Sequence, residues 1–232
     1  MPITEHARRY LLNEGLKPDT IIKTGSPMKE ILEYYMPKIE KSNVLKKLNL
    51  TRNEYFIVST HREENIDYQD NFDNLLESLV EIANVFEKRI IVSTHPRTMK
   101  KLVNINKLNV NKLIEFMKPM GLFDYVKLQM NAYCVVSDSG TVTEESSILN
   151  FPAITIRQAH ERPEGMDEGT LIMSGLKKNN VIDAIKVAVA HSSDIERRFK
   201  IVQDYDVDNF SKKVLKLIFS YCDYINRTVW HK

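Results

Sequence analysis

Side chains that could bind phosphate or transfer protons recur at one kind of place in this sequence, directly after short apolar runs. In chain order they are His61, Arg62, Glu64, Asn65, His95, Arg157, Glu161 and Arg162. An arginine guanidinium matches the geometry of a phosphate group, and the charge of a histidine ring changes near neutral pH. A single histidine in such a place is more often a surface or capping residue. The prediction of a site therefore depends on whether the fold brings these residues together.

The apolar runs are short, and amphipathic segments separate them. The runs occupy residues 55–59, 89–93, 113–117, 133–137, 153–156 and 170–173, and the helical patterns occupy residues 71–87, 98–108, 123–131, 141–149, 181–190 and 210–225. Short apolar strands that alternate with amphipathic helices predict a parallel sheet covered on both faces, the doubly wound, Rossmann-like α/β fold. In such a sheet the loops after the strands share one edge, where ligands bind. We therefore expect the histidines and arginines to converge there.

The first 50 residues are less regular. Thr4 can cap a helix over residues 5–14, residues 20–24 are expected to form a strand, and residues 38–50 have a lysine-rich helical pattern. We predict three parts: residues 1–50, a Rossmann-like domain over residues 51–209, and a C-terminal helix over residues 210–232.

A polar turn follows the fourth apolar run. Asp138, Ser139 and Gly140 stand before a predicted helix. One interpretation is an ordinary helix cap, because Asp and Ser cap helices well. The other is a phosphate site, because a helix start exposes backbone N–H groups and glycine allows close approach. Glu144 and Glu145 likewise either form a solvated helix face or accept hydrogen bonds from ribose hydroxyls.

Composition argues against several classes of function. The 33 basic and 31 acidic side chains give a formal net charge of +2, so no single-sign field favours nucleic acid or a membrane surface. The longest apolar runs have four or five residues, whereas a membrane span needs about 20. Cys134 and Cys222 lack metal-ligand or redox spacing. We expect a cytoplasmic protein with no metal, cofactor, nucleic acid or membrane as partner.

The chemistry of the candidate residues indicates a phosphate-containing ligand that carries a sugar or a ribose. The sequence contains neither the Gly-x-x-x-x-Gly-Lys motif nor the Gly-x-Gly-x-x-Gly motif. Their absence argues against a P-loop NTPase and against a dinucleotide oxidoreductase.

Four ordered motifs resemble the non-hydrolysing UDP-N-acetylglucosamine 2-epimerase family. They are Thr60-His61-Arg62-x-Glu64-Asn65, His95-Pro96, Ser137-Asp138-Ser139-Gly140 with Glu144-Glu145, and Glu161-Arg162-Pro163-Glu164 with Gly169-Thr170. Residues 23–28, 155–160 and 165–168 resemble the branch that forms UDP-N-acetyl-L-fucosamine for capsule or O-antigen. The resemblance implies a glycosyltransferase-B-like architecture of two Rossmann-type domains with a UDP-sugar in the cleft, of which this chain holds the C-terminal domain.

The resemblance also implies roles for individual residues. His61 and His95 are expected to be catalytic, with His61 and Arg62 also meeting the phosphates. The other expected substrate-binding residues are Glu64, Asn65, Tyr125 near the uracil, Ser139 and Gly140 at the diphosphate, Glu144, Glu145 at the ribose, and Arg157, Glu161 and Arg162 on the sugar side. In the family reaction a base removes the C2 proton, UDP leaves C1 to give a glycal, and UDP adds back with protonation on the opposite face.

In the family, the acid/base carboxylates belong to the first Rossmann domain, to which the resemblance does not extend. Residues 1–50 resemble the end of that domain and the inter-domain segment. We therefore expect a chain that binds UDP-sugar but is inactive alone, and that forms a homodimer or associates with a complementing N-terminal domain. A glycosyltransferase of the same fold and a non-catalytic UDP-sugar-binding module are the alternatives.

Overall fold

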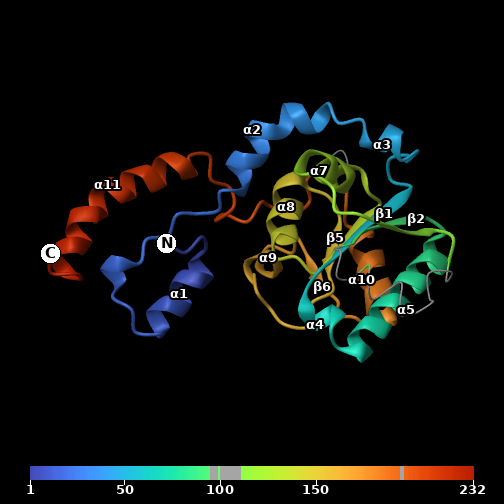
Figure 1. The fold of residues 1–232 in the computed structure, drawn as a ribbon, viewed down its shortest axis with the longest axis horizontal. Helices are drawn as coiled ribbons and strands as arrows, with labels where there is room; N and C mark the ends of the chain where they lie inside the picture. The colour runs from blue at the N-terminus through green and yellow to red at the C-terminus, as the bar shows by residue number, and fades with distance from the viewer. Residues whose placement is uncertain (95–98, 100–110, 194–195) are drawn as a thin grey trace.

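The computed structural model of the chain describes residues 1–94, 99, 111–193 and 196–232 (Figure 1). At its centre is a six-stranded parallel sheet with the order β3-β2-β1-β4-β5-β6. The strands are β1 (Tyr55–Thr60), β2 (Arg89–Thr94), β3 (Ile114–Met117), β4 (Cys134–Ser137), β5 (Ala153–Thr155) and β6 (Ile172–Met173). The order reverses between β1 and β4, as in a doubly wound fold. The predicted fold class is confirmed.

β1 explains why the strands read as continuous apolar runs. Phe56 and Val58 belong to the hydrophobic cluster on one face of the sheet, Tyr55 and Ile57 belong to the cluster on the other, and all four side chains are fully buried. A strand covered on both faces buries every side chain. The first face is covered by α5 (Gln69–Phe86) and α10 (Lys178–Ala190), and the second by α7 (Leu122–Asn131) and α8 (Thr141–Leu149).

The long helices follow the predicted periodicity. In α5 the buried apolar side chains are Phe72, Leu75, Leu79, Ile82 and Ala83, and the last four belong to the cluster against the sheet. Two four-residue helices, α4 (Glu63–Ile66) and α9 (Glu164–Asp167), were not predicted, because one turn is too short to show a period.

The N-terminal residues divide between the sheet and an outer group of helices. α2 (Met28–Glu40) packs on α7, and α3 (Val44–Lys47) adds Val44 to the cluster on the second face. α1 (Glu5–Asn13) and α11 (Phe210–Thr228) lie to one side of the sheet together with both termini (Figure 1). α11 has no buried residue. Among the described residues, none of the helices combines the length and the hydropathy of a transmembrane segment.

Two expectations for local structure need correction. The predicted strand at residues 20–24 is wrong, because a 3-10 helix, η1 (Pro18–Thr20), is followed there by chain without a partner strand. Residues 38–50 do not form one helix but divide between the end of α2, the short α3 and turns. The helix predicted at residues 98–108 falls outside the described residues, apart from position 99. The division of the chain at residues 50 and 209 stays a prediction.

The chain passes twice between the sheet and the outer helices, at residues 25–26 and at residues 204–207. These two crossings contact each other. The backbone N–H of Ser26 donates to the carbonyl of Asp204 at 2.9 Å. Gly25 has a φ of +83°, and a Cβ built on it would lie 2.4 Å from Cγ2 of Val207. Both the left-handed backbone and the close approach require glycine at this position.

Candidate functional site

β1 and β4 are neighbours where the strand order reverses, and they end together. Ser59 pairs with Ser137, and the backbone N–H of Asp138 continues the ladder by donating to the Ser59 carbonyl at 3.2 Å. The loops that follow the two strands therefore leave the sheet side by side. In an open α/β sheet, this switch point is where ligands bind.

The carboxylate of Asp138 joins these two loops. It is fully buried and accepts hydrogen bonds from the backbone N–H of Arg62 at 3.0 Å and from the side-chain amide of Asn65 at 3.1 Å. The backbone N–H of His61 lies 3.1 Å from each carboxylate oxygen, and the ring Nδ1 of His61 lies 3.3 Å from Oδ1. Asn65 is buried and uses its amide here, whereas the His61 ring remains half exposed.

Three arginines that were predicted to bind substrate lie at the same edge, and they form ion pairs with two glutamates. Arg62 donates to Glu161 at 2.9 Å, and Arg157 pairs with the same carboxylate oxygen. Arg162 pairs with the buried carboxylate of Glu144. The Glu161 carboxylate thus lies between two guanidinium groups, a position that a phosphate group could also fill.

The segment that carries Glu161 and Arg162 closes over the start of α8. A Cβ built on Gly140 would lie 3.1 Å from both Nε of Arg162 and Oε2 of Glu161. Ser139, Gly140 and Arg157 line a small cavity of about 20 Å³ together with these two residues. The positive end of the α8 dipole points into this region, so the geometry favours a negatively charged group.

Four buried polar atoms at this edge have no hydrogen-bond partner within the part of the chain that the structure describes. They are Nε of Arg62, Oε1 of Glu64, Oγ1 of Thr155 and Nε of Arg157. Nε of Arg157 and Oε1 of Glu64 are 3.9 Å apart, which is too long for a hydrogen bond. Leaving a buried donor or acceptor unpaired costs about 1–3 kcal/mol, and a ligand that offers both acceptors and hydroxyl groups would satisfy these atoms.

A second polar group lies on α7 and α8. Gln129 donates to the carboxylate of Glu145 at 2.6 Å, and both side chains are buried. Burial raises the pKa of Glu145 above its ordinary value. Burial, followed by the nearby Glu145 carboxylate, also raises the pKa of the Tyr125 hydroxyl. Tyr125 and Glu145 therefore share one low-dielectric region beside the strand ends.

Glu144 is buried between two partners from distant parts of the sequence. The Ser26 hydroxyl donates to Oε1 of Glu144, and Arg162 donates to Oε2. The alternative that Glu144 and Glu145 form a solvated helix face is wrong, since their exposed fractions are 3% and 8%. Ser26 is 118 positions away in sequence, so no local pattern indicated this contact.

Two more residues, Thr155 and Tyr205, contribute to the site but were not predicted from the sequence. Thr155, the last residue of β5, contributes one of the unpaired atoms. The fully buried Tyr205 donates to the carboxylate of Glu164 at 2.6 Å and so anchors the segment after Arg162. Thr155 could have been predicted, because it is a polar residue at the end of a strand. The sequence near Tyr205 contains no pattern that indicates its role. His95 lies outside the described residues.

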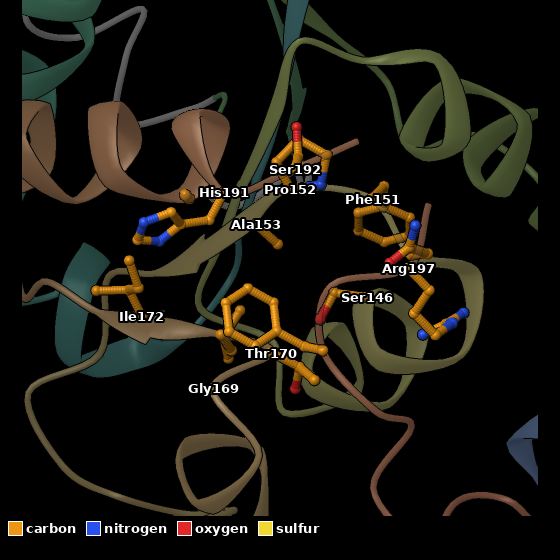
Figure 2. A pocket seen from close by; sticks show the side chains of 14 residues that line it. Ser146, Phe151, Pro152, Ala153, Gly169, Thr170, Ile172, His191, Ser192 and Arg197 are labelled. Atoms are coloured by element: carbon orange, nitrogen blue, oxygen red, sulfur yellow. The ribbon is translucent and has the colours of Figure 1, made fainter. Parts of the chain in front are cut away.

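A larger pocket, of about 60 Å³, lies at the opposite edge of the sheet, where β5 and β6 begin. Figure 2 shows Thr170, His191 and Arg197 among the side chains around it. α8 and α10 end beside it, and Arg197 donates to the carbonyls of Ser147 and Ile148 near the end of α8. Helix C-termini carry partial negative charge, so this pocket is unfavourable for a diphosphate. Within the described ranges, no cluster of His, Cys, Asp and Glu side chains could hold a metal ion.

Comparison with known proteins finds a matching family model and similar solved structures. A family model described as UDP-N-acetylglucosamine 2-epimerase matches residues 1–219. A structure of UDP-N-acetylglucosamine 2-epimerase from Rickettsia bellii has a TM-score of 0.91 and 48% sequence identity, over 99% of this chain and 61% of that chain. A structure of the Methanocaldococcus jannaschii enzyme in complex with UDP-GlcNAc and UDP has a TM-score of 0.83 and 31% identity, over 94% and 59% of the two chains.

The curated relatives give the same result. The UDP-N-acetylglucosamine 2-epimerase of Methanocaldococcus jannaschii is 36% identical over 190 residues, which are 79% of this chain and 52% of that protein. The chain thus spans about half the length of the curated relatives it matches and about three fifths of the solved structures.

Proposed function

Because the chain belongs to the UDP-N-acetylglucosamine 2-epimerase family, we propose that the carboxyl edge of its sheet binds the UDP portion of a UDP-N-acetylhexosamine. The observation that carries this proposal is the set of buried polar atoms around the ion pairs of Glu161 that have no partner among the described residues. They include one nitrogen each of Arg62 and Arg157, and guanidinium groups are the side chains best suited to a diphosphate. The Methanocaldococcus jannaschii structure with UDP-GlcNAc and UDP supports the same class of ligand.

The proposed placement of the ligand follows the charge of the site. The diphosphate lies at the start of α8 beside Ser139, Gly140 and Arg62, where the helix dipole and the guanidinium stabilise its negative charge. Glu145 accepts hydrogen bonds from the ribose, and Tyr125 flanks the uracil. This arrangement is supported by the proximity of the two side chains, since the Glu145 carboxylate contributes to the raised pKa of the Tyr125 hydroxyl after burial.

The sugar is proposed to lie toward the loop after β5. Arg157, Glu161 and Arg162 belong to this loop, and the unpaired atoms of Glu64 and Thr155 lie at the same edge. Hydroxyl groups can both donate and accept, so a hexosamine suits an edge that offers both kinds of unpaired atom.

The proposed reaction is inversion at C2. A base removes the C2 proton while the bond from C1 to the UDP oxygen breaks, which gives a glycal and UDP. UDP then re-forms the bond to C1, and C2 accepts a proton on the opposite face. Arg62 and the α8 dipole stabilise the charge that develops on the departing diphosphate, and His61 and His95 are the proposed proton-transferring residues of this chain.

The finer proposal is that the 232-residue chain binds the nucleotide but does not epimerise alone, and that it works as a homodimer or with a complementing domain. It is supported by the length of the relatives, of which this chain spans about half to three fifths. The same proposal places the reaction in the cytoplasm, which the composition of the chain supports, and in the supply of sugars for capsule or O-antigen polysaccharide, which the sequence resemblance supports.

Calorimetry with UDP and uridine, together with an NMR assay of UDP-GlcNAc conversion, tests the proposal. We expect UDP to bind more tightly than uridine and no C2 epimer to form. Absence of binding at millimolar UDP would contradict the assignment of the site. Epimer formation by this chain would reject its inactivity, and sugar transfer that depends on an acceptor would assign it to the glycosyltransferases.

A further inference from the structure

Asp138 is a fully buried carboxylate at the end of β4, and its hydrogen bonds come from the loop after β1. A buried carboxylate is stable only when hydrogen-bond donors surround it. Here the donors are the backbone N–H groups of His61 and Arg62 and the Asn65 amide, and the ring Nδ1 of His61 lies 3.3 Å from Oδ1. The Asp138 side chain therefore determines the path of the loop after β1, which carries residues proposed to bind the diphosphate and the sugar.

The two carboxylate oxygens have different surroundings. Oδ2 faces three donors, which are the backbone N–H groups of His61 and Arg62 and the amide of Asn65. Oδ1 faces the His61 backbone N–H at 3.1 Å and the His61 ring Nδ1 at 3.3 Å. An ionised carboxylate only accepts hydrogen bonds, so it favours the ring form in which the nitrogen that faces it carries the proton. In a neutral ring the other nitrogen, Nε2, then has a free lone pair.

We infer that Asp138 is a positioning residue of this site, which fixes His61 as the Nδ1–H tautomer and leaves Nε2 free to accept a proton from the ligand. The inference rests on the proposed function for the identity of the ligand. It adds a residue that acts through His61 and does not itself touch the substrate. The backbone bond from Asp138 to the Ser59 carbonyl holds the carboxylate in place, so the two strand ends set the orientation of the ring.

Asp138→Asn provides a sharp test, because the variant keeps the shape of the side chain. Three donors face the Oδ2 position, so the amide oxygen is expected there. The amide NH2 group then faces Nδ1 of His61 and donates to it. The neutral ring should consequently change from the Nδ1–H to the Nε2–H tautomer.

Two-bond 1H–15N correlation spectra of the ligand-free chain in alkaline buffer measure this tautomer, and His61→Gln assigns the signal. We expect Nδ1–H in the wild-type chain and Nε2–H in Asp138→Asn. Asp183→Asn, an exposed change on α10, should leave the spectrum of His61 unchanged. A wild-type ring that is Nε2–H, or the same tautomer in wild type and Asp138→Asn, would overturn the inference. The wild-type measurement decides even if Asp138→Asn fails to fold.

UDP titration separates this inference from the proposed function. In the wild-type chain, UDP should shift the Nε2 resonance of His61 more than the Nδ1 resonance, because Nδ1 stays turned toward Asp138. If UDP does not bind, the proposed function fails, whereas the ligand-free tautomers still decide the role of Asp138. If UDP binds and only Nδ1 shifts, the assignment of Nε2 to the ligand is wrong.

Discussion

Gln129 donates a 2.6 Å hydrogen bond to Glu145, and burial raises the pKa of this carboxyl group above its ordinary value of 4.5. The folded chain therefore holds the proton more tightly than the unfolded chain, so stability falls as the pH rises from 4.5 through the folded-state value. Glu145→Gln cannot ionise and keeps an oxygen that can accept from Gln129. We expect this variant to lose the pH-dependent fall and to be more stable than wild type at neutral pH.

Urea unfolding at a series of pH values from 4.5 upward measures this effect. Glu14→Gln, at an exposed position at the end of α1, is the matched control and should follow the wild-type profile. Parallel profiles for wild type and Glu145→Gln would show that the buried carboxyl group does not titrate in this range.

Arg62→Ala should weaken UDP binding about tenfold or more and change uridine binding by less than about threefold. Only the diphosphate needs the guanidinium charge, and a hydrogen bond to a charged group is worth about 1.5–3 kcal/mol. Calorimetry with both ligands measures the difference. Arg9→Ala, on the exposed surface of α1, should change neither affinity. Equal losses for UDP and uridine would reject the assignment of Arg62 to the phosphates.

Gly140→Ala should weaken UDP binding with little change in stability. The atoms nearest to the added Cβ belong to the ends of the Arg162 and Glu161 side chains, at 3.1 Å, and these can move apart. The same Cβ would occupy the space over which a phosphate approaches the start of α8. Gly121→Ala, at the start of α7 with no atom within 4 Å of the new Cβ, is the control. Unchanged UDP affinity in Gly140→Ala would place the diphosphate elsewhere.

Glu161→Gln distinguishes two roles for a residue predicted to bind substrate. Its carboxylate pairs with Arg62 and Arg157 in the ligand-free chain, so a diphosphate must compete with it for their charge. We expect UDP to bind about two- to fivefold more tightly to the variant, a modest gain because the pairs are partly exposed. Glu77→Gln, which affects an exposed pair with Lys178, should have no effect. Weaker binding of UDP would instead indicate direct contact between Glu161 and the ligand.

Gly25→Ala should destabilise the chain more than Gly15→Ala. Both positions have a left-handed backbone, with φ of +83° and +84°, so both variants incur a strain of about 1–2 kcal/mol. Only the new Cβ at position 25 meets Val207, which adds about 1–3 kcal/mol of overpacking. Urea unfolding gives both values, and Val207→Ala should recover part of the loss in Gly25→Ala. Equal losses at positions 15 and 25 would contradict the predicted close packing.

The sheet could be predicted because its evidence is local. Residues 55–58 are apolar without alternation since both faces of β1 are covered, and the spacing of Phe72, Leu75 and Leu79 is that of a helix with one buried face. Local evidence also explains why the strand expected at residues 20–24 was wrong, because a local pattern does not show whether a partner strand exists. Ile21 is buried like a strand residue, but within the described residues no neighbouring strand pairs with it.

The meeting of His61, Arg62 and Gly140 followed from the fold, because parallel strands end at one edge. The partners of the charged residues did not follow. Glu144 is held by Ser26 and Arg162, and contacts over such sequence separations depend on packing that no local pattern encodes.

The two crossings also set an order for the assembly of the chain during synthesis. Residues 5 and 19 are made before the strands of the sheet, yet the backbone N–H of Glu5 donates to the side chain of Asp204 at 2.7 Å, and Asp19 accepts from Tyr224. A third contact between the two ends of the chain is made by Lys213, which donates to the Thr24 carbonyl at 2.8 Å. These contacts can therefore form only after the residues that follow the sheet have been made, when the sheet can already be folded.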